Sequence, residues 1–285
     1  MSIEFYKMHG TGNDFVVIDC IQQPLNEATL PNLARKICDR HFGVGADQLL
    51  LVHPSEEADF RFQIFNSDGS EAEMCGNGIR CFAKFVFDHG NTCKEKFAIE
   101  TLAGIQNVQL KLEDGHIATV EADMGKPHLR PDEIPVQADS EIVKDYPIVV
   151  DGEQMRFTAV SIGNPHCVIF VDDLNQVPVE SWGRKIEHHP LFPHRTNVEF
   201  VEVVDTDEVR VRVWERGTGM TLACGTGACA SLVAASLTER TLRKAVIQLP
   251  GGGLLVEWRD DGHVYLTGPA VEVFSGILGN EWEEI

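Results

Sequence analysis

The segment Cys75-Gly76-Asn77-Gly78 recurs 149 residues later as Cys224-Gly225-Thr226-Gly227. Three further pairs of segments repeat in the same order and with nearly the same spacing: 12–17 and 163–168, 48–52 and 197–201, and 60–66 and 209–215. Small changes in this spacing are what loops of unequal length produce between duplicated domains. The chain is therefore predicted to be an internal duplication, which governs its whole fold.

The duplication predicts two domains of similar, strand-rich fold. The first covers residues 1–123 together with the terminal residues 271–285, and the second covers residues 124–270. Prolines between residues 127 and 147 predict an irregular crossover between the domains. A strand without a counterpart in the second half is expected over residues 270–274, and we expect it to pair back onto the first domain.

Local periodicity predicts one main helix and several strands in each domain. In residues 60–66 and 209–215 apolar side chains largely alternate with polar or charged ones, which is typical of strands. After Cys75 the apolar residues recur at the spacing of one helix face. After Cys224 nearly every residue is apolar, on all sides of the predicted helix, which predicts a helix enclosed by the sheet of its own domain. A further helix is expected over residues 33–40.

Charge and cysteine spacing exclude several classes of protein. The 285 residues carry 24 Lys and Arg against 44 Asp and Glu, a formal net charge of −20, which disfavours nucleic acid and membrane surfaces as partners. No apolar stretch approaches the ~20 residues of a membrane span, and the N-terminus lacks the pattern of a signal peptide, so we expect a cytoplasmic protein. None of the eight cysteines forms a C-x-x-C pair, so we expect thiols and no metal site.

Each repeated cysteine lies at the start of a predicted helix. Unpaired N–H groups and the positive end of the helix dipole favour a thiolate there, which makes the sulfur a usable base. The adjacent glycines leave room for a substrate carboxylate on the same N–H groups. Two such helix ends could remove a proton from one face of a carbon and return a proton to the other. The pattern therefore predicts racemisation or epimerisation by Cys75 and Cys224.

Polar residues at equivalent places in the two halves predict a shared substrate site. The pairs are Asn13 and Asn164, Gln48 and Asn197, and Asn66 and Glu215. Arg216 has no basic counterpart and would offer a bidentate grip on a second carboxylate. Cys167 follows His166 in a predicted strand, so their side chains should point apart. The other cysteines lack the symmetry and are expected to be small buried residues: Cys20, Cys38, Cys81, Cys93 and Cys229.

Six motifs, taken in order, resemble the diaminopimelate epimerase family over essentially the whole chain. They are KMHGTGNDF (7–15), GADQ (45–48), NSDGS (66–70), CGNGIRC (75–81), GNPH (163–166), and ERG through ACGTG (215–227). The resemblance implies an α/β (α+β) fold of two pseudo-symmetric domains, each a curved, mostly antiparallel sheet around a central helix. It also implies an isomerase that converts LL-diaminopimelate to meso-diaminopimelate without pyridoxal phosphate or another cofactor, on the route to lysine and peptidoglycan. Members of the family are generally homodimers.

The resemblance further implies a role for each matching residue. Cys75 and Cys224 are the acid/base pair, and His166 and Glu215 tune the pKa of these cysteines. The chain departs from the family pattern at Met220, where Glu is usual, and at Phe274, where Tyr is frequent near the dimer contact. The substrate-binding positions are Asn13, Gln48, Asn66, Gly76, Asn77, Asn164, Asn197, Glu215, Arg216, Gly225 and Thr226.

Three other functions fit parts of this pattern. A relative of proline racemase would share the paired cysteines, but a monocarboxylic substrate does not need Arg216 and the asparagine set. A duplicated amino-acid-binding module would use the cysteines only for packing, and it would not exchange hydrogen between its ligand and solvent. A thiol oxidoreductase is disfavoured because the chain has no C-x-x-C pair.

Overall fold

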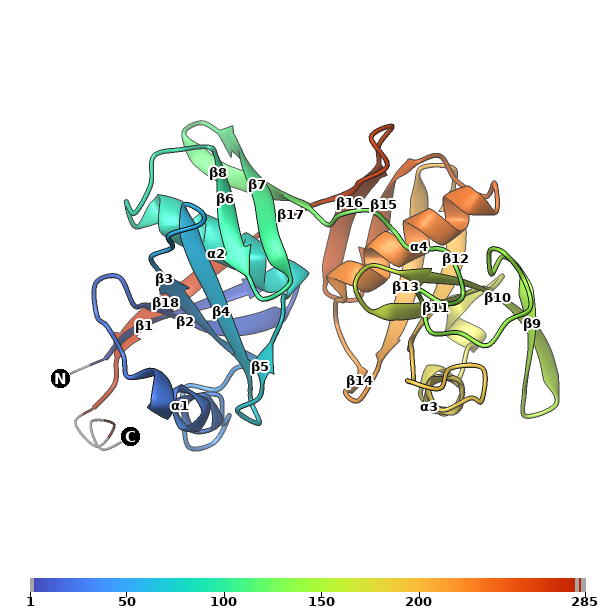
Figure 1. Ribbon diagram of the computed structural model, residues 1–285, viewed down its shortest axis with the longest axis horizontal. Helices are drawn as coiled ribbons and strands as arrows, with labels where there is room; N and C mark the ends of the chain where they lie inside the picture. The colour runs from blue at the N-terminus through green and yellow to red at the C-terminus, as the bar shows by residue number, and fades with distance from the viewer. Residues whose placement is uncertain (1–2, 280–281, 283–285) are drawn as a thin grey trace. The chain divides into compact units, whose positions relative to one another are not determined.

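The computed structural model describes residues 3–279 and 282 (Figure 1). The chain divides into two compact units: unit 1 is Met1–Ala122 with Gly268–Ile285, and unit 2 is Asp123–Thr267. The boundaries predicted from the sequence, after residue 123 and before residue 271, lie one and three residues away. Within the described part of the chain, no helix is long and apolar enough to cross a membrane.

Unit 1 combines one curved sheet with two α-helices. Its elements are β1 (Glu4–Gly10), β2 (Asn13–Asp19), η1 (Glu27–Thr29), α1 (Leu30–Ile37), β3 (Gln48–His53), β4 (Phe60–Asn66), β5 (Glu71–Ala72), α2 (Gly76–Asp88), β6 (Lys96–Thr101), β7 (Gly104–Glu113), β8 (His116–Asp123) and β18 (Val271–Ile277). The sheet runs β18-β1-β2-β3-β4-β6-β7-β8, with β5 paired to β4. The pairings β2–β3 and β4–β6 are parallel, and the others among these are antiparallel.

Unit 2 repeats this arrangement. Its elements are β9 (Tyr146–Val150), β10 (Glu153–Ser161), β11 (Pro165–Phe170), η2 (Leu174–Gln176), α3 (Val179–Glu187), β12 (Asn197–Asp205), β13 (Glu208–Glu215), β14 (Gly219–Met220), α4 (Gly225–Leu237), β15 (Lys244–Leu249), β16 (Gly252–Trp258) and β17 (Val264–Gly268). The sheet runs β9-β10-β11-β12-β13-β15-β16-β17, with β14 paired to β13. The crossover predicted over residues 127–147 is irregular through residue 145, with turns, bends and one isolated bridge, and its last two residues belong to β9.

The sheet of each unit curves around its longest helix, α2 or α4 (Figure 1). These helices begin at Gly76 and Gly225, and the N-caps are Cys75 and Cys224. Gly90, with a φ of +76°, follows α2 as the left-handed residue at which the helix terminates. The predicted class, two similar mixed α/β domains, is confirmed.

The terminal strand β18 pairs antiparallel with β1 at the edge of unit 1. In unit 2 the same position, beside the first long strand β10, is taken by β9. The expectation that the terminal strand has no counterpart in the second half is therefore wrong. An alignment by offset could not find this equivalence, because β9 directly precedes its partner β10 in the chain whereas β18 follows the whole of unit 2.

The two smaller helices show where sequence prediction fell short. The helix expected over residues 33–40 is α1, which begins and ends three residues earlier. Pro31 lies in its first turn, where a missing N–H is tolerated. The counterpart α3 was not predicted, because Gly183 disfavours a helix. A Cβ at Gly183 would lie 2.5 Å from Trp214 Cβ, so the close packing of α3 against β13 requires glycine at this position.

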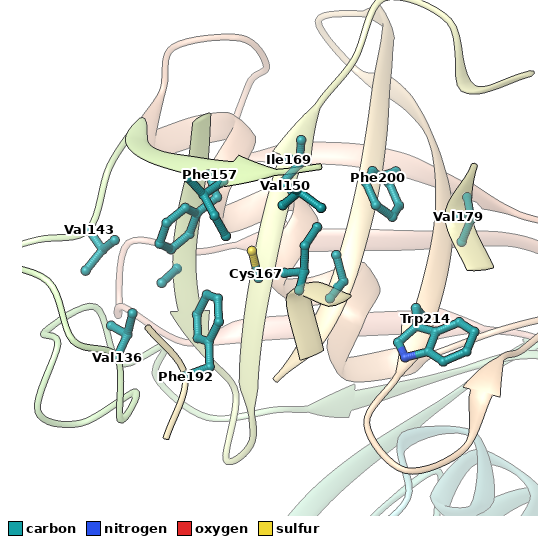
Figure 2. Packing of buried hydrophobic residues seen from close by; sticks show 14 of the residues in the cluster. Val136, Val143, Val150, Phe157, Cys167, Ile169, Val179, Phe192, Phe200 and Trp214 are labelled. Carbon is teal, nitrogen blue, oxygen red and sulfur yellow. The ribbon is translucent and has the colours of Figure 1, made fainter. Parts of the chain in front are cut away.

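An apolar layer of unit 2 includes residues of α3 and of the neighbouring strands (Figure 2). Phe157, Cys167 and Phe200 come from β10, β11 and β12, and Val179 comes from α3. Cys167 is fully buried in this layer. Since neighbouring residues of a strand point to opposite faces, His166 points to the other side of the sheet, as predicted.

Apart from Cys167, five cysteines have no equivalent cysteine in the other half of the chain, and four of these five are buried, as predicted. The buried thiols are Cys20, Cys38, Cys81 and Cys229. The prediction for Cys93 is wrong, because this residue is exposed. It lies in the loop between α2 and β6, and a connecting loop runs over the surface instead of through the core.

Candidate active site

The Cys75 sulfur lies at the N-terminus of α2 in unit 1. The backbone of Cys75 is extended, with a φ of −139°, and the Gly78 N–H donates to Sγ at 3.4 Å. The Cys75 thiol donates to Asn13 Oδ1 at 3.6 Å, and Asn77 Nδ2 donates to the same oxygen at 3.2 Å. Three residues predicted for the site, Asn13, Cys75 and Asn77, therefore form one hydrogen-bonded group.

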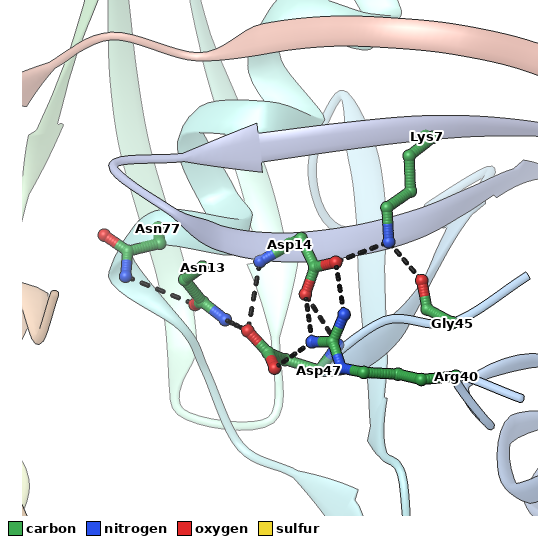
Figure 3. Close-up of polar contacts among 7 residues, drawn as sticks. All are labelled: Lys7, Asn13, Asp14, Arg40, Gly45, Asp47 and Asn77. Carbon is green, nitrogen blue, oxygen red and sulfur yellow. Dashed lines mark hydrogen bonds and ion pairs between the residues drawn. The ribbon is translucent and has the colours of Figure 1, made fainter. Parts of the chain in front are cut away.

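A network of charged side chains holds Asn13 in one orientation (Figure 3). Asn13 Nδ2 donates to Asp47 Oδ2 at 2.9 Å, which leaves its Oδ1 facing Cys75. Asp47 accepts from Arg40 at 2.7 Å, and Arg40 also donates to both oxygens of Asp14. Sequence reasoning gave these three charged residues no role. Asp14 directly follows a predicted site residue, which is the signal that could have identified this network.

The Asp14 carboxylate is expected to stabilise unit 1 above about pH 4. Burial alone would raise the pKa of this carboxyl, but hydrogen bonds from Arg40 and Lys7 outweigh burial and hold the pKa well below its usual range. Such a group contributes stability that is complete above its unfolded pKa of about 3.9 and is lost as the pH falls through its folded pKa. Asp14→Asn should therefore lower the free energy of unfolding by about 1–3 kcal/mol at pH 7. In urea unfolding at pH 3, 5 and 7, the difference from the parent should shrink at pH 3.

Asp88→Asn is the matched control, because Asp88 forms a surface ion pair with Lys84 four residues before it. Pairs of this kind contribute about 0.3–0.5 kcal/mol, so this variant should stay close to the parent. Equal losses in the two variants, or an Asp14→Asn loss that is independent of pH, would show that the Asp14 charge does not stabilise the unit.

Gln48 and Asn66, also predicted for the site, face each other across β3 and β4. Gln48 Nε2 donates to Asn66 Oδ1 at 2.8 Å, and Asn66 Nδ2 donates to Ser70 Oγ at 3.0 Å. Gln48 is the first residue of β3 and pairs with Phe15 of the parallel strand β2. The amide pair therefore lies at the same end of the sheet as Asn13, the first residue of β2.

The Cys224 sulfur lies at the equivalent place, at the N-terminus of α4 in unit 2. The Gly227 N–H donates to Sγ at 3.3 Å, and Thr226 Oγ1 lies 3.5 Å from Sγ. Burial raises the pKa of the Cys224 thiol well above its usual value, and the carboxylates of Glu215 and Glu199 raise it further. Hydrogen bonds from Thr226 and Gly227 act in the opposite direction but are weaker. The expectation that the helix end favours a thiolate is therefore wrong for Cys224.

His166 is fully buried on β11 and links a predicted site residue to an unpredicted one. Its Nε2 lies 2.9 Å from Asn164 Oδ1, and its Nδ1 lies 2.7 Å from Glu199 Oε1. Glu199, on β12, is itself fully buried. Sequence reasoning missed Glu199. The equivalent residue of the first half is the apolar Leu50, so no matching polar pair marked this position. A carboxylate within the otherwise apolar run 198–201 is the signal that could have identified it.

The remaining predicted residues of unit 2 lie around the turn after β13. Asn197 Oδ1 accepts from the Arg216 backbone N–H at 2.8 Å. The exposed Arg216 guanidinium donates to the His194 carbonyl at 3.2 Å and has further N–H groups with which to bind a ligand. Glu215 accepts a hydrogen bond from Thr221 Oγ1 at 2.5 Å. The turn thus presents a cation and an anion side by side in the sequence.

Comparison with known proteins identifies the family. A profile of the family described as Diaminopimelate epimerase matches residues 5–130 and 158–273. The chain belongs to the diaminopimelate epimerase family. Diaminopimelate epimerases of Moorella thermoacetica and Acetivibrio thermocellus are 55% and 52% identical to it over 275 residues, and each alignment covers 96% of this chain and 98% of the relative. The predicted family and the predicted class, an isomerase that epimerises an amino acid, are confirmed.

Solved structures of lower sequence identity share the fold. The crystal structure of a Bacillus anthracis phenazine biosynthesis protein of the PhzF family gives a TM-score of 0.73 at 17% identity, covering 98% of this chain and 99% of that chain. A hydroxyproline epimerase from Agrobacterium vitis gives a TM-score of 0.70 at 16% identity, covering 97% and 91%. At these identities the likeness concerns the fold alone.

Proposed function

We propose that the chain interconverts LL- and meso-diaminopimelate by a two-cysteine acid/base mechanism that needs no cofactor or metal. The observation that carries this proposal is the matched placement of Cys75 and Cys224, each the N-cap of the central helix of its unit. An N-cap sulfur lies beside N–H groups that can bind a carboxylate, so each helix end combines a proton carrier with an anion site. The names of the similar relatives supply the substrate.

The reaction removes one proton from the substrate and returns another. The Cys75 sulfur takes the proton from the carbon that bears the amino and carboxyl groups, so the C–H bond breaks and an S–H bond forms. The electron pair left on that carbon spreads into the carboxylate. Cys224 then gives its S–H proton to the opposite face, which inverts the centre. The developing charge is stabilised by groups at the two helix ends: Gly76, Asn77, Gly225 and Thr226.

Arg216, together with Glu215, is proposed to bind the distal amino-acid end of the substrate, and Arg216→Lys tests this role. The variant keeps the charge but loses the planar fork. A charge-assisted hydrogen bond contributes about 1.5–3 kcal/mol, so KM for diaminopimelate should rise about tenfold or more. Arg130→Lys, at an exposed arginine of the crossover, should leave KM at the parent value. Unchanged kinetics in Arg216→Lys would assign the distal end to other residues.

The chain is further proposed to act as a cytoplasmic homodimer in the synthesis of lysine and peptidoglycan precursors. The edge strand β18 supports the dimer. Val271, Val273 and Ile277 of β18 are all exposed apolar residues. Phe274 packs edge-on against Phe5, with ring centroids 6.2 Å apart. Exposed apolar side chains on an edge strand are suited to contact with a second copy.

Val273→Asp is expected to convert the dimer to a monomer, because it places a charge among the exposed apolar side chains of β18. Val149→Asp is the matched control, since β9 holds the same edge position in unit 2 and Val149 is 54% exposed against 56% for Val273. Sedimentation velocity over a range of concentrations measures the mass. A dimeric Val273→Asp would place the interface elsewhere, and a monomeric parent would remove the proposal.

The proposed activity is tested with LL-diaminopimelate in heavy water. Protein dialysed against EDTA and treated with hydroxylamine should place solvent deuterium on the inverted carbon while the optical rotation moves toward that of the meso mixture. Binding without exchange would indicate an amino-acid-binding module. Exchange into proline but not into diaminopimelate would indicate a proline racemase. Activity that is lost in this treatment and restored by pyridoxal phosphate or a metal would overturn the cofactor-free mechanism.

A further inference from the structure

The surroundings of the two N-cap cysteines differ at two buried positions. In unit 2, His166 on β11 and Glu199 on β12 are fully buried, and His166 Nδ1 lies 2.7 Å from Glu199 Oε1. In unit 1 the equivalent positions are Phe15 on β2 and Leu50 on β3, as the matching parallel registers of the two strand pairs show. The apolar surroundings of α2 in unit 1 thus become partly ionic around α4 in unit 2.

The Glu199 carboxylate lies against the first turn of α4. A Cβ added at Gly227 would lie 2.8 Å from Glu199 Oε1 and 3.2 Å from Cys224 Sγ, so the oxygen and the sulfur border the same small space. In unit 1 a Cβ at the equivalent Gly78 would meet a ring carbon of Phe15 at 3.3 Å. A carboxylate at this position beside the helix end is therefore particular to unit 2.

Two contacts hold the His166 ring between Asn164 and Glu199. Both ring nitrogens of His166 face oxygen atoms, one of Asn164 and one of Glu199, so both can donate when the ring is protonated and Glu199 is ionised. Glu199 Oε2 is buried and has no hydrogen-bond partner among the described residues. A buried carboxylate of this kind destabilises the fold relative to the apolar pair of unit 1.

We propose that Glu199 is a positioning residue for Cys224 and holds this cysteine as the proton-carrying member of the pair. This inference rests on the proposed two-cysteine mechanism and makes the two sulfurs unequal before substrate arrives. The negative charge of Glu199 opposes a second negative charge on the neighbouring sulfur, and the bond to His166 keeps the carboxylate in place. Cys224 is then the acid of the pair, and the role of base falls to Cys75.

The charges that act on the Cys224 thiol come from two strands. Burial raises the pKa of this thiol, and Glu215 on β13 and Glu199 on β12 raise it further, while His166 on β11 pairs with Glu199. Strands β10, β15 and β16 also pack against α4, and the structure describes all three in full; their buried residues include no ionisable group. Because Glu215 is present in every variant below, a change in titration reports on Glu199.

The test measures how fast iodoacetamide alkylates Cys224 at each pH in the full chain, read from the Cys224 peptide by mass spectrometry. Glu199→Gln keeps the shape of the side chain and removes its charge, so the alkylation profile should move to lower pH by about 1 unit. The Cys75 profile, read from the same samples, should not move. In turnover, the alkaline limb of kcat/KM should move in the same direction.

Control variants separate charge from folding. Glu199→Asp retains the charge and should return the Cys224 profile toward that of the parent. Glu187→Gln removes another buried carboxylate of unit 2, which accepts from Trp214 Nε1 at 2.8 Å, and should leave the Cys224 profile unmoved. If Glu199→Gln does not fold, the double variant His166→Phe/Glu199→Leu installs the apolar pair of unit 1 and should give the same shift.

A folded Glu199→Gln or double variant with the parent profile at Cys224 overturns the proposal, and so does an equal shift in Glu187→Gln. Alkylation needs no substrate, so its result is independent of the proposed activity. Absence of deuterium exchange would refute epimerisation, and the Cys224 titration would still decide the role of Glu199.

Discussion

Replacing Cys75 or Cys224 by alanine is expected to lower kcat/KM for diaminopimelate by about 10²–10⁴-fold, the usual contribution of one general acid or base. In the proposed mechanism, each turnover needs one sulfur to remove a proton and the other to return a proton on the opposite face. Neither sulfur can replace the other, because each is fixed at the end of its own helix. The rate of change in optical rotation from LL-diaminopimelate measures the loss.

Cys81→Ala and Cys229→Ala are the matched controls, because these thiols lie within the same two helices and are fully buried. Each removes a sulfur from the core and should cost some stability through the cavity that it leaves, while kcat/KM stays within a few-fold of the parent. Near-parent turnover by Cys75→Ala or Cys224→Ala would refute the two-base mechanism. An equal loss in all four variants would point to helix packing as the cause.

Iodoacetamide at neutral pH is expected to abolish activity by modifying Cys75 while Cys224 stays unmodified. The thiolate is the reactive form of cysteine. Burial and two carboxylates raise the pKa of Cys224, whereas Cys75 is only partly buried. Two equal helix ends would instead have predicted equal reactivity. Mass mapping at successive times, beside residual activity, follows both sulfurs, and diaminopimelate should slow the modification of Cys75.

The exposed thiol of Cys93 will also react, and Cys93→Ser accounts for it. This variant should lose activity at the parent's rate, since Cys93 lies in the loop after α2. If Cys224 is modified first, or if Cys93→Ser resists inactivation, the assignment of the accessible catalytic sulfur to Cys75 is wrong.

Local spacing was sufficient to predict the two central helices, their N-cap cysteines, and the strands β4 and β13. Each depends on residues within a few positions of one another, and the duplication supports each prediction with a second copy. The same positional equivalence selected Asn13 and Gln48, which the structure joins to Asn77 and Asn66 by hydrogen bonds. Residues without a marked counterpart, such as Asp47, were missed, because their partners are distant in the sequence.

Contacts between distant segments account for the features that were not predicted. Gly183 disfavours a helix on its own, yet α3 includes it, because the Trp214 side chain occupies the place of a Cβ and only glycine fits there. The equivalence of β9 and β18 depends on which strand each one joins, and chain order conceals it. In both cases the energy comes from packing against another element, which a local pattern does not contain.

The protonation of the two sulfurs likewise depends on tertiary contacts that the local sequence pattern does not contain. A repeated Cys-Gly motif places each sulfur at a helix N-terminus, and on that local ground both should be thiolates. The folded chain buries Cys224 and brings Glu199 and Glu215 toward it from β12 and β13. A pKa depends on burial and on distances to other charges, and both quantities exist only once the strands have assembled. Two similar domains with a cysteine each follow from the pattern of the sequence, while the difference between those cysteines comes from the three-dimensional contacts around them.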